Sequence, residues 1–96
     1  KGDILLEPSE RTVKIKEKSL QRLTQLEFRL LYILMVNAGQ TLSSDRVIEY
    51  VWGYNGKGSR DLVRGLIKRL RDKIEEDPQN PRYILTATGA GYALKP

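Results

Sequence analysis

The residues with the most evident chemistry lie in one short basic stretch, residues 60–73. Its charged side chains carry a net charge of +4 and comprise Arg60, Arg64, Lys68, Arg69, Arg71 and Lys73 against Asp61 and Asp72. Spacings of three and four residues place Arg60, Arg64, Lys68 and Arg71 on one face of a helix. Such a face can enter the major groove of DNA, where Arg reads guanine and both cations neutralise phosphates. A solvated charged face without a partner is the alternative.

An apolar seam runs along the same stretch and predicts the element that would carry these cations. Its members recur at helical spacing and are Val63, Leu66, Ile67, Leu70 and Ile74. The pattern predicts an amphipathic helix over residues 59–76. The two prolines of residues 77–81 end it, because proline disfavours helix in the residue before it.

The N-terminal residues predict a small antiparallel sheet. Short strand patterns cover residues 4–7, 12–16 and 19–22, and two apolar residues of the second alternate with lysines, as expected for a half-buried strand. A second basic cluster lies here, made of Lys14, Lys16, Lys18 and Arg22. We favour a solvated sheet face for this cluster, and the alternatives are contact with DNA, a neighbouring subunit or another domain.

Two further helices are predicted before the basic one. Thr24 and Glu27 have the spacing of a capping box, which begins an apolar helix that ends before Gly39. Ser43 caps a shorter helix that ends at Gly53 and whose apolar stripe includes Trp52. We expect Trp52 to lie in the core, because burying a large ring is the usual role of this residue.

A glycine-rich loop and a hairpin complete the organisation. Three glycines within residues 53–58 predict an irregular loop. Apolar residues in 83–87 and 92–94 flank Thr88-Gly89-Ala90-Gly91, which predicts a C-terminal hairpin. The 96 residues are enough for one domain, and 17 Lys and Arg against 12 Asp and Glu give a charge of +5. This charge favours nucleic acid as a partner, followed by an anionic membrane surface.

The composition excludes much catalytic chemistry. The chain has no Cys and no His, so it cannot form a zinc finger, a redox pair or a Ser-His or Cys-His catalytic unit. The carboxylates Glu75-Glu76-Asp77 stand in a row without convergent geometry, so we predict no metal site, no cofactor and no enzymatic activity. The longest apolar run, residues 30–38, is too short to span a bilayer.

Five blocks of sequence carry a resemblance to a known family. They are Leu23-Thr24-Gln25-Leu26-Glu27-Phe28-Arg29-Leu30-Leu31, Leu42-Ser43-Ser44-Asp45-Arg46-Val47, Val51-Trp52-Gly53-Tyr54, Ile67-Lys68-Arg69-Leu70-Arg71-Asp72-Lys73-Ile74-Glu75 and Tyr83-Ile84-Leu85-Thr86 with Gly89-Ala90-Gly91-Tyr92. In this order and spacing the chain resembles the DNA-binding effector domain of OmpR/PhoB-type response regulators. The resemblance covers essentially the whole chain. It implies an α+β winged helix-turn-helix with an N-terminal antiparallel four-stranded sheet, three helices and a C-terminal β-hairpin wing.

The resemblance also implies roles for particular residues. The helix over residues 59–76 would lie in the major groove and the wing, about residues 82–94, near the minor groove. Base contacts would come from Arg64 and Arg69, and phosphate contacts from Arg60, Lys68 and Arg71. The wing residues Thr86, Thr88 and Gly89 would approach the DNA. The polymerase-contact loop would comprise Gly53, Tyr54, Asn55, Gly56, Lys57 and Gly58.

The expected partners follow from the same resemblance. They are double-stranded DNA with direct-repeat promoter sites, RNA polymerase and an upstream receiver domain, with two copies on DNA and no membrane. The expected setting is the bacterial cytoplasm. We interpret residues 1–96 as one domain excised from a longer chain, because no Met stands first.

Three positions depart from the family pattern. Thr88 stands where Arg often precedes the first wing glycine, so minor-groove readout is expected to be weak. Asp61 stands where Arg is frequent, and Arg64 where Asp is frequent, which should change sequence preference. An alternative function, favoured slightly by Thr88 and Asp61, is a winged-helix protein-interaction module with little intrinsic DNA specificity.

Overall fold

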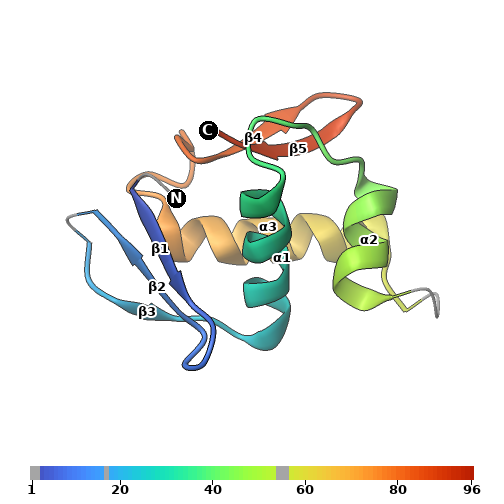
Figure 1. Cartoon of the computed structure of the whole chain (residues 1–96). Helices are drawn as coiled ribbons and strands as arrows, with labels where there is room; N and C mark the ends of the chain where they lie inside the picture. The colour runs from blue at the N-terminus through green and yellow to red at the C-terminus, as the bar shows by residue number, and fades with distance from the viewer. Residues whose placement is uncertain (1–2, 17, 54–56) are drawn as a thin grey trace.

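The computed structural model describes residues 3–16, 18–53 and 57–96. Over these residues the chain forms five strands and three helices, arranged as Figure 1 shows. Their bounds are Ile4–Glu7 for β1, Thr12–Ile15 for β2, Gln21–Arg22 for β3, Gln25–Val36 for α1, Ser44–Trp52 for α2, Arg60–Ile74 for α3, Ile84–Ala87 for β4 and Gly91–Leu94 for β5. The predicted α+β class, with three helices and a C-terminal hairpin, is confirmed.

The N-terminal strands form an antiparallel sheet in the order β1, β2, β3. Ile4 lies opposite Ile15, and Val13 and Ile15 are buried while Lys14 is exposed, which confirms the predicted alternation. The prediction of four strands is wrong, since three strands lie in the described residues of this region. In the described residues a turn joins β1 to β2, and the cap of α1 at Thr24 follows β3 almost at once.

The core lies where α1 meets α2, α3 and the two sheets. The capping box begins α1 as predicted, with Glu27 N donating to Thr24 Oγ1 at 3.2 Å and Thr24 N donating to Glu27 Oε1 at 2.8 Å. In Figure 1 α1 crosses α3, and it contacts both α2 and α3. Trp52 is half-buried and packs against the core, which confirms its predicted place. Within the described residues, no helix has the length and apolar character needed to cross a bilayer.

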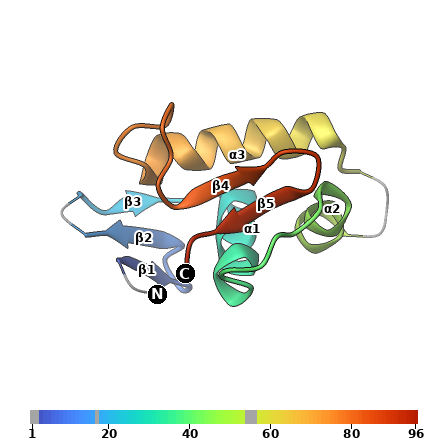
Figure 2. The same ribbon diagram turned by 90° about the horizontal axis from the view of Figure 1, so that it is seen from above.

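The C-terminal hairpin is fastened to the helices through its second strand. β4 and β5 pair antiparallel, with Ile84 opposite Leu94, and β5 pairs on its other side with Leu42 in the connection between α1 and α2. Leu42 N donates to Tyr92 O at 2.7 Å, and Tyr92 N donates to Leu42 O at 2.9 Å. Gly91 has a φ of +141°, and a Cβ there would overlap the carbonyl oxygen of Leu42. Figure 2 shows this connection running beside β5, with β4 on the side of α3.

Candidate nucleic-acid interface

The basic helix α3 is amphipathic, as its sequence predicts. Ser59 caps its start, with Leu62 N donating to Ser59 Oγ at 3.2 Å. The five seam residues are buried: Val63, Leu66, Ile67, Leu70 and Ile74. Arg60, Arg64, Lys68 and Arg69 are exposed on the rest of its surface, where a partner can reach them. Because the seam fixes α3 on the core, these cations have a defined direction relative to the hairpin.

A groove separates α3 from the hairpin, which we call the wing. Its volume is about 340 Å³, and the residues lining it are Arg64, Ile67, Lys68, Arg71, Asp72, Pro78, Gln79, Thr86 and Tyr92. A second hollow of about 270 Å³ adjoins it at the start of α2 and shares Arg64, Thr86 and Tyr92 with the first. Ser43, Ser44 and Arg60 also line this second hollow. The structure therefore brings together Arg60, Arg64, Lys68, Arg71 and Thr86, the predicted contact residues along one side of α3.

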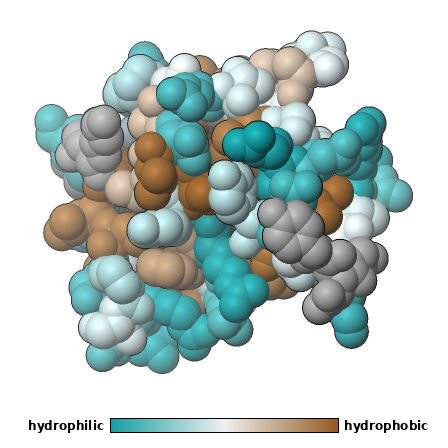
Figure 3. All heavy atoms as spheres, turned by 45° about the vertical axis from the view of Figure 1, so that its right-hand side comes forward, coloured by the Kyte–Doolittle hydropathy of each residue, from teal (hydrophilic) through white to brown (hydrophobic). Residues whose placement is uncertain are grey.

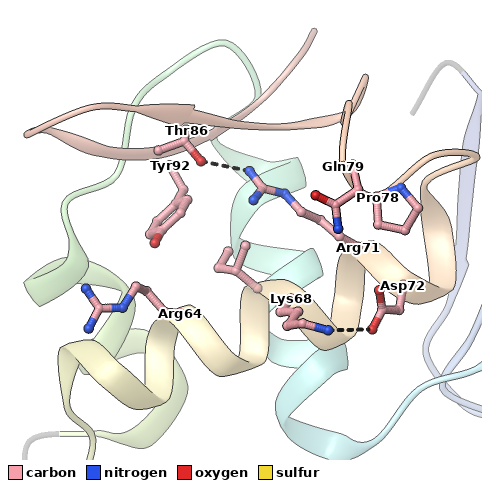
Figure 4. A pocket seen from close by; sticks show the side chains of 9 residues that line it. Arg64, Lys68, Arg71, Asp72, Pro78, Gln79, Thr86 and Tyr92 are labelled. Carbon is pink, nitrogen blue, oxygen red and sulfur yellow. Dashed lines mark hydrogen bonds and ion pairs between the residues drawn. The ribbon is translucent and has the colours of Figure 1, made fainter.

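Arg71 is half-buried and binds the wing. Its Nε and Nη2 donate to Ile84 O at 3.1 and 2.7 Å, and Nη2 donates to Thr86 Oγ1 at 2.8 Å. Figure 4 shows this side chain reaching from α3 to Thr86. A guanidinium has five N–H donors, so the two on Nη1 remain for the phosphate contact predicted from sequence. In the structure, Arg71 therefore connects α3 to β4.

Glu75 makes a second connection between α3 and the wing, which the sequence analysis missed. The residue is 1% exposed. Its Oε1 accepts from Arg82 N at 2.7 Å, its Oε2 accepts from Ile84 N at 2.8 Å, and Tyr83 N reaches both oxygens. One carboxylate thus satisfies three consecutive backbone donors at the entry to β4. The sequence shows only a row of three carboxylates at the helix end, for which no metal site is predicted and no burial is indicated.

Charged residues also fix the C-terminal end of α3 to the N-terminal half of the chain. Lys73 Nζ donates to Arg22 O at 2.8 Å and to Glu27 Oε1 at 2.6 Å, and Glu27 is 2% exposed. Burial alone would raise the pKa of Glu27, but the hydrogen bonds from Lys73 and Thr24 and the charge of Lys73 outweigh it and hold the pKa below its ordinary value. Lys18 Nζ donates to Lys73 O at 3.4 Å and Glu75 O at 3.1 Å. Lys18 is therefore a partner of α3, not part of a purely solvated face.

The outward surface of α3 carries exposed ion pairs. Arg60 pairs with Asp45 of α2 at 3.8 Å, and Lys68 pairs with Asp72 at 3.6 Å. Arg64 pairs with Asp61 one turn earlier on the same helix. Exposed pairs of this kind contribute only about 0–1 kcal/mol, so these cations can exchange partners at small cost.

Arg69 lies apart from the other predicted contact residues. Five positions separate it from Arg64, which puts the two side chains about 140° apart around the helix axis. Its guanidinium lies beside Gly65, where a Cβ would be 3.6 Å from Nη1. In the part of the chain that the structure describes, Arg69 has no ion pair or side-chain hydrogen bond. The two predicted base-contact residues therefore flank the outward surface of α3 from opposite sides.

The remaining predicted site residues lie in the wing turn and in the loop before α3. Thr88 and Gly89 are exposed at the tip of the wing. Gly53 ends α2 with a φ of +85°, and a Cβ on Gly58 would press on Ile48 and Trp52. Lys57 is exposed. The predicted loop residues Tyr54, Asn55 and Gly56 lie outside the described residues.

In the space-filling view, hydrophilic residues surround smaller hydrophobic areas on the face shown (Figure 3). An apolar hollow lies between β1 and α1, away from the wing, and its lining includes Leu5, Tyr32, Met35 and Val36. The groove beside α3 differs from it, because Arg64, Lys68 and Arg71 line it.

Comparison with known proteins gives a consistent set of relatives. The family described as "Transcriptional regulatory protein, C terminal" matches residues 17–94. The response regulator DrrB of Thermotoga maritima, an OmpR/PhoB homologue, is 35% identical with a TM-score of 0.84, over 99% of this chain and 42% of DrrB. This chain thus spans less than half of that relative.

Two solved DNA-binding domains are similar over nearly their whole length. One is the Klebsiella pneumoniae RstA DNA-binding domain, in complex with the RstA box, which is 26% identical with a TM-score of 0.83. The match covers 98% of this chain and 92% of the RstA domain. The other is the DNA-binding domain of Escherichia coli CadC, which is 27% identical with a TM-score of 0.84. This match covers 98% of this chain and 88% of the CadC domain.

Proposed function

The chain belongs to the family of C-terminal domains of transcriptional regulatory proteins, of the OmpR/PhoB type, and from this premise we propose that it binds specific double-stranded DNA through α3 and the wing. The observation that carries the proposal is the exposed row of Arg60, Arg64 and Lys68 beside the groove to the wing. α3 enters the major groove with its N-terminal part, as recognition helices do. Arg64 and Arg69 contact base edges from the two sides of the helix, and Arg60 and Lys68 hold phosphates.

The wing lies near the minor groove in this proposal and contributes little sequence readout. Residues 83–94 include no Lys or Arg, so the wing tip at Thr88 and Gly89 has no cation to place in a narrow minor groove. Thr86 stands at the base of the wing and is already bonded to Arg71. The wing therefore supports the position of α3 and adds backbone contacts.

The larger assembly is part of the proposal as well. Residues 1–96 form one DNA-binding domain of a longer regulator, and an upstream receiver domain controls it. Two copies bind direct repeats, and the loop of residues 53–58 contacts RNA polymerase. The length of DrrB, of which this chain matches 42%, supports the additional domain.

The test is selection of bound sequences from a random duplex library. The best site and a scrambled duplex are then titrated at two salt concentrations. A repeated half-site bound far more tightly than the scrambled duplex is expected. The logarithm of the affinity should fall with the logarithm of salt concentration with a slope of about −0.9 per phosphate neutralised.

Two results would contradict the proposal. Equal and weak binding of both duplexes with a steep salt dependence would mean that the basic surface acts only electrostatically. Absence of binding at low salt would favour the alternative, a winged-helix module for protein contacts. The exposed pairing of Asp61 with Arg64 is the observation that favours this alternative, because it lowers the positive charge of the helix surface.

A further inference from the structure

The start of α3, the part that enters the major groove in the proposed function, carries a carboxylate. Asp61 is the second residue of the helix, and its side chain is 85% exposed. It accepts a hydrogen bond from Nη2 of Arg64, whose side chain is 69% exposed. A carboxylate at this place repels nearby phosphates and therefore lowers affinity for any DNA sequence. The same carboxylate stabilises the start of α3, because it complements the positive end of the helix dipole.

The partner of Asp61 stands at a position where its direction matters. Arg64 lines both hollows beside α3 and could extend toward Thr86 and Tyr92 on the wing or along the helix. Figure 4 shows its guanidinium directed away from Arg71 and Thr86. Within residues 3–16, 18–53 and 57–96, Asp61 supplies the hydrogen bond to this guanidinium, and Nε and Nη1 have no other partner there. Asp61 thus biases this long side chain toward one direction in the free domain, although the exposed pair can still open when a base edge offers other acceptors.

The geometry points to Asp61 as a positioning residue that holds the Arg64 guanidinium ready to read one guanine. This inference rests on the proposed DNA binding and deepens it. Arg reads guanine by donating two parallel hydrogen bonds to O6 and N7, which requires a fixed fork. Holding the fork before binding removes part of the entropy cost of ordering it. Asp61 therefore lowers affinity for DNA in general and raises discrimination at one base pair.

A second pair on the same helix provides a matched control. Lys68 and Asp72 are also exposed and are joined at 3.6 Å. Lys presents a compact ammonium without a planar fork, so its orientation carries little base information. Neutralising Asp72 removes the same charge from α3 as neutralising Asp61. Both variants should therefore bind scrambled DNA more tightly, and only Asp61→Asn should lose base discrimination.

The experiment compares variants of the 96-residue chain on the selected duplex, a scrambled duplex and a panel with each base pair changed in turn. Arg64→Ala first identifies the base pair that Arg64 reads. Asp61→Asn should bind the scrambled duplex about twofold to tenfold more tightly and lose about fivefold or more of the discrimination at that same base pair. Asp72→Asn should also bind the scrambled duplex more tightly but keep the discrimination at that base pair. Asp61→Glu, which keeps the carboxylate, should restore part of the preference.

Additional measurements separate this role from a purely structural one. Circular dichroism and thermal unfolding show whether Asp61→Asn and Asp61→Ser keep the fold. The double variant Asp61→Asn with Arg64→Ala should discriminate no worse than Arg64→Ala alone, because both changes remove one function. A loss of helix stability alone would weaken all base pairs alike.

Several outcomes overturn the inference. Unchanged preference in folded Asp61→Asn would show that Arg64 needs no positioning. A loss at a different base pair would show that Asp61 contacts bases itself. Wild-type protein that binds selected and scrambled duplexes equally would overturn the proposed DNA recognition, and the inference with it. If the wild type binds the selected duplex specifically and Asp61→Asn keeps the same base preference, the inference is overturned but the proposed DNA recognition is not.

Discussion

The two ends of α3 hold their charged residues in opposite ways. At the C-terminal end, buried or half-buried groups bind other parts of the chain: Glu75 binds the start of β4, and Lys73 binds Glu27. At the N-terminal end, Arg60 and Arg64 form exposed ion pairs. Buried polar contacts are costly to break, whereas exposed pairs exchange partners with little loss. The comparison indicates that one end of the helix is fixed to the rest of the chain, whereas the other end carries cations that are available to a partner, as the proposed DNA binding requires.

The largest effect is expected from removing the Glu75 carboxylate. Glu75→Ala leaves three consecutive backbone N–H groups at a buried site without their acceptor, so the free energy of unfolding should fall by about 3–5 kcal/mol. Urea denaturation followed by circular dichroism measures this loss. The neighbouring exposed residue provides the control, since Glu76→Ala should stay within about 0.5 kcal/mol of wild type. If the two variants were equally stable, the contacts of Glu75 would not fix the C-terminal end of α3, and the contrast between its two ends would be wrong.

A somewhat smaller loss is expected at the other attachment of the wing. Gly91→Ala places a methyl group against the Leu42 carbonyl, at a φ of +141° that L residues rarely adopt. We expect a loss of about 2–4 kcal/mol, because the backbone of β5 must move away from Leu42. Gly89→Ala is the control, since its Cβ would meet open space and only its φ of +77° is unfavourable, at about 1 kcal/mol. Thermal unfolding of both variants would show whether the wing depends on this second attachment.

The ion pair between Glu27 and Lys73 predicts an acid-dependent effect of intermediate size. The pKa of Glu27 is lowered in the folded chain, so its contribution is complete above the unfolded value of about 4.3 and is lost as the pH falls through the folded pKa. Glu27→Gln should lower the free energy of unfolding at pH 7 by about 1–3 kcal/mol. The gap to wild type should narrow as the pH falls below about 4.3. Denaturation titrations from pH 7 to pH 3 measure this difference in the free energy of unfolding. A difference that stays constant over this range would contradict the assigned ion pair.

The smallest effects on stability are expected at the exposed cations of α3. Arg69→Ala and Lys68→Ala should each change the free energy of unfolding by less than about 0.5 kcal/mol. Their effects on DNA binding should differ: Arg69→Ala costs about 1–3 kcal/mol and relaxes discrimination at one base pair, whereas Lys68→Ala weakens all sequences alike. Competition binding on a panel of single-base-pair variants measures both. Wild-type discrimination by Arg69→Ala would remove its assignment as a base contact.

The features that sequence predicted well are those set by neighbouring residues. The capping box of Thr24 and Glu27 and the apolar seam of α3 depend on spacings of three and four residues, and the structure has both. The hairpin around Gly89 and Gly91 follows from turn residues between two apolar runs. Local patterns of this kind are visible in any window of the sequence.

The features that sequence did not predict depend on contacts between distant residues. Lys18 looks like any other lysine of a half-exposed sheet until the fold brings it to the end of α3. Glu75 had no sequence signal for burial, because its acceptor role depends on the path of residues 77–82. The prediction of a fourth strand rested on the family resemblance, whereas the strand patterns of the residues themselves indicated the three strands that the described residues form. The position of Arg69 on the far side of α3 from the wing follows from helix geometry, but base contact there stays a prediction.

The bonds from Lys18 to the last turn of α3 also bear on how the domain is made. The chain separations are 55 residues to Lys73 and 57 to Glu75. During synthesis the first strands are made before the end of α3 that Lys18 contacts exists. Contacts of such long range close slowly and together. We therefore expect this domain to acquire its native form after synthesis of α3 and the wing, in one cooperative step.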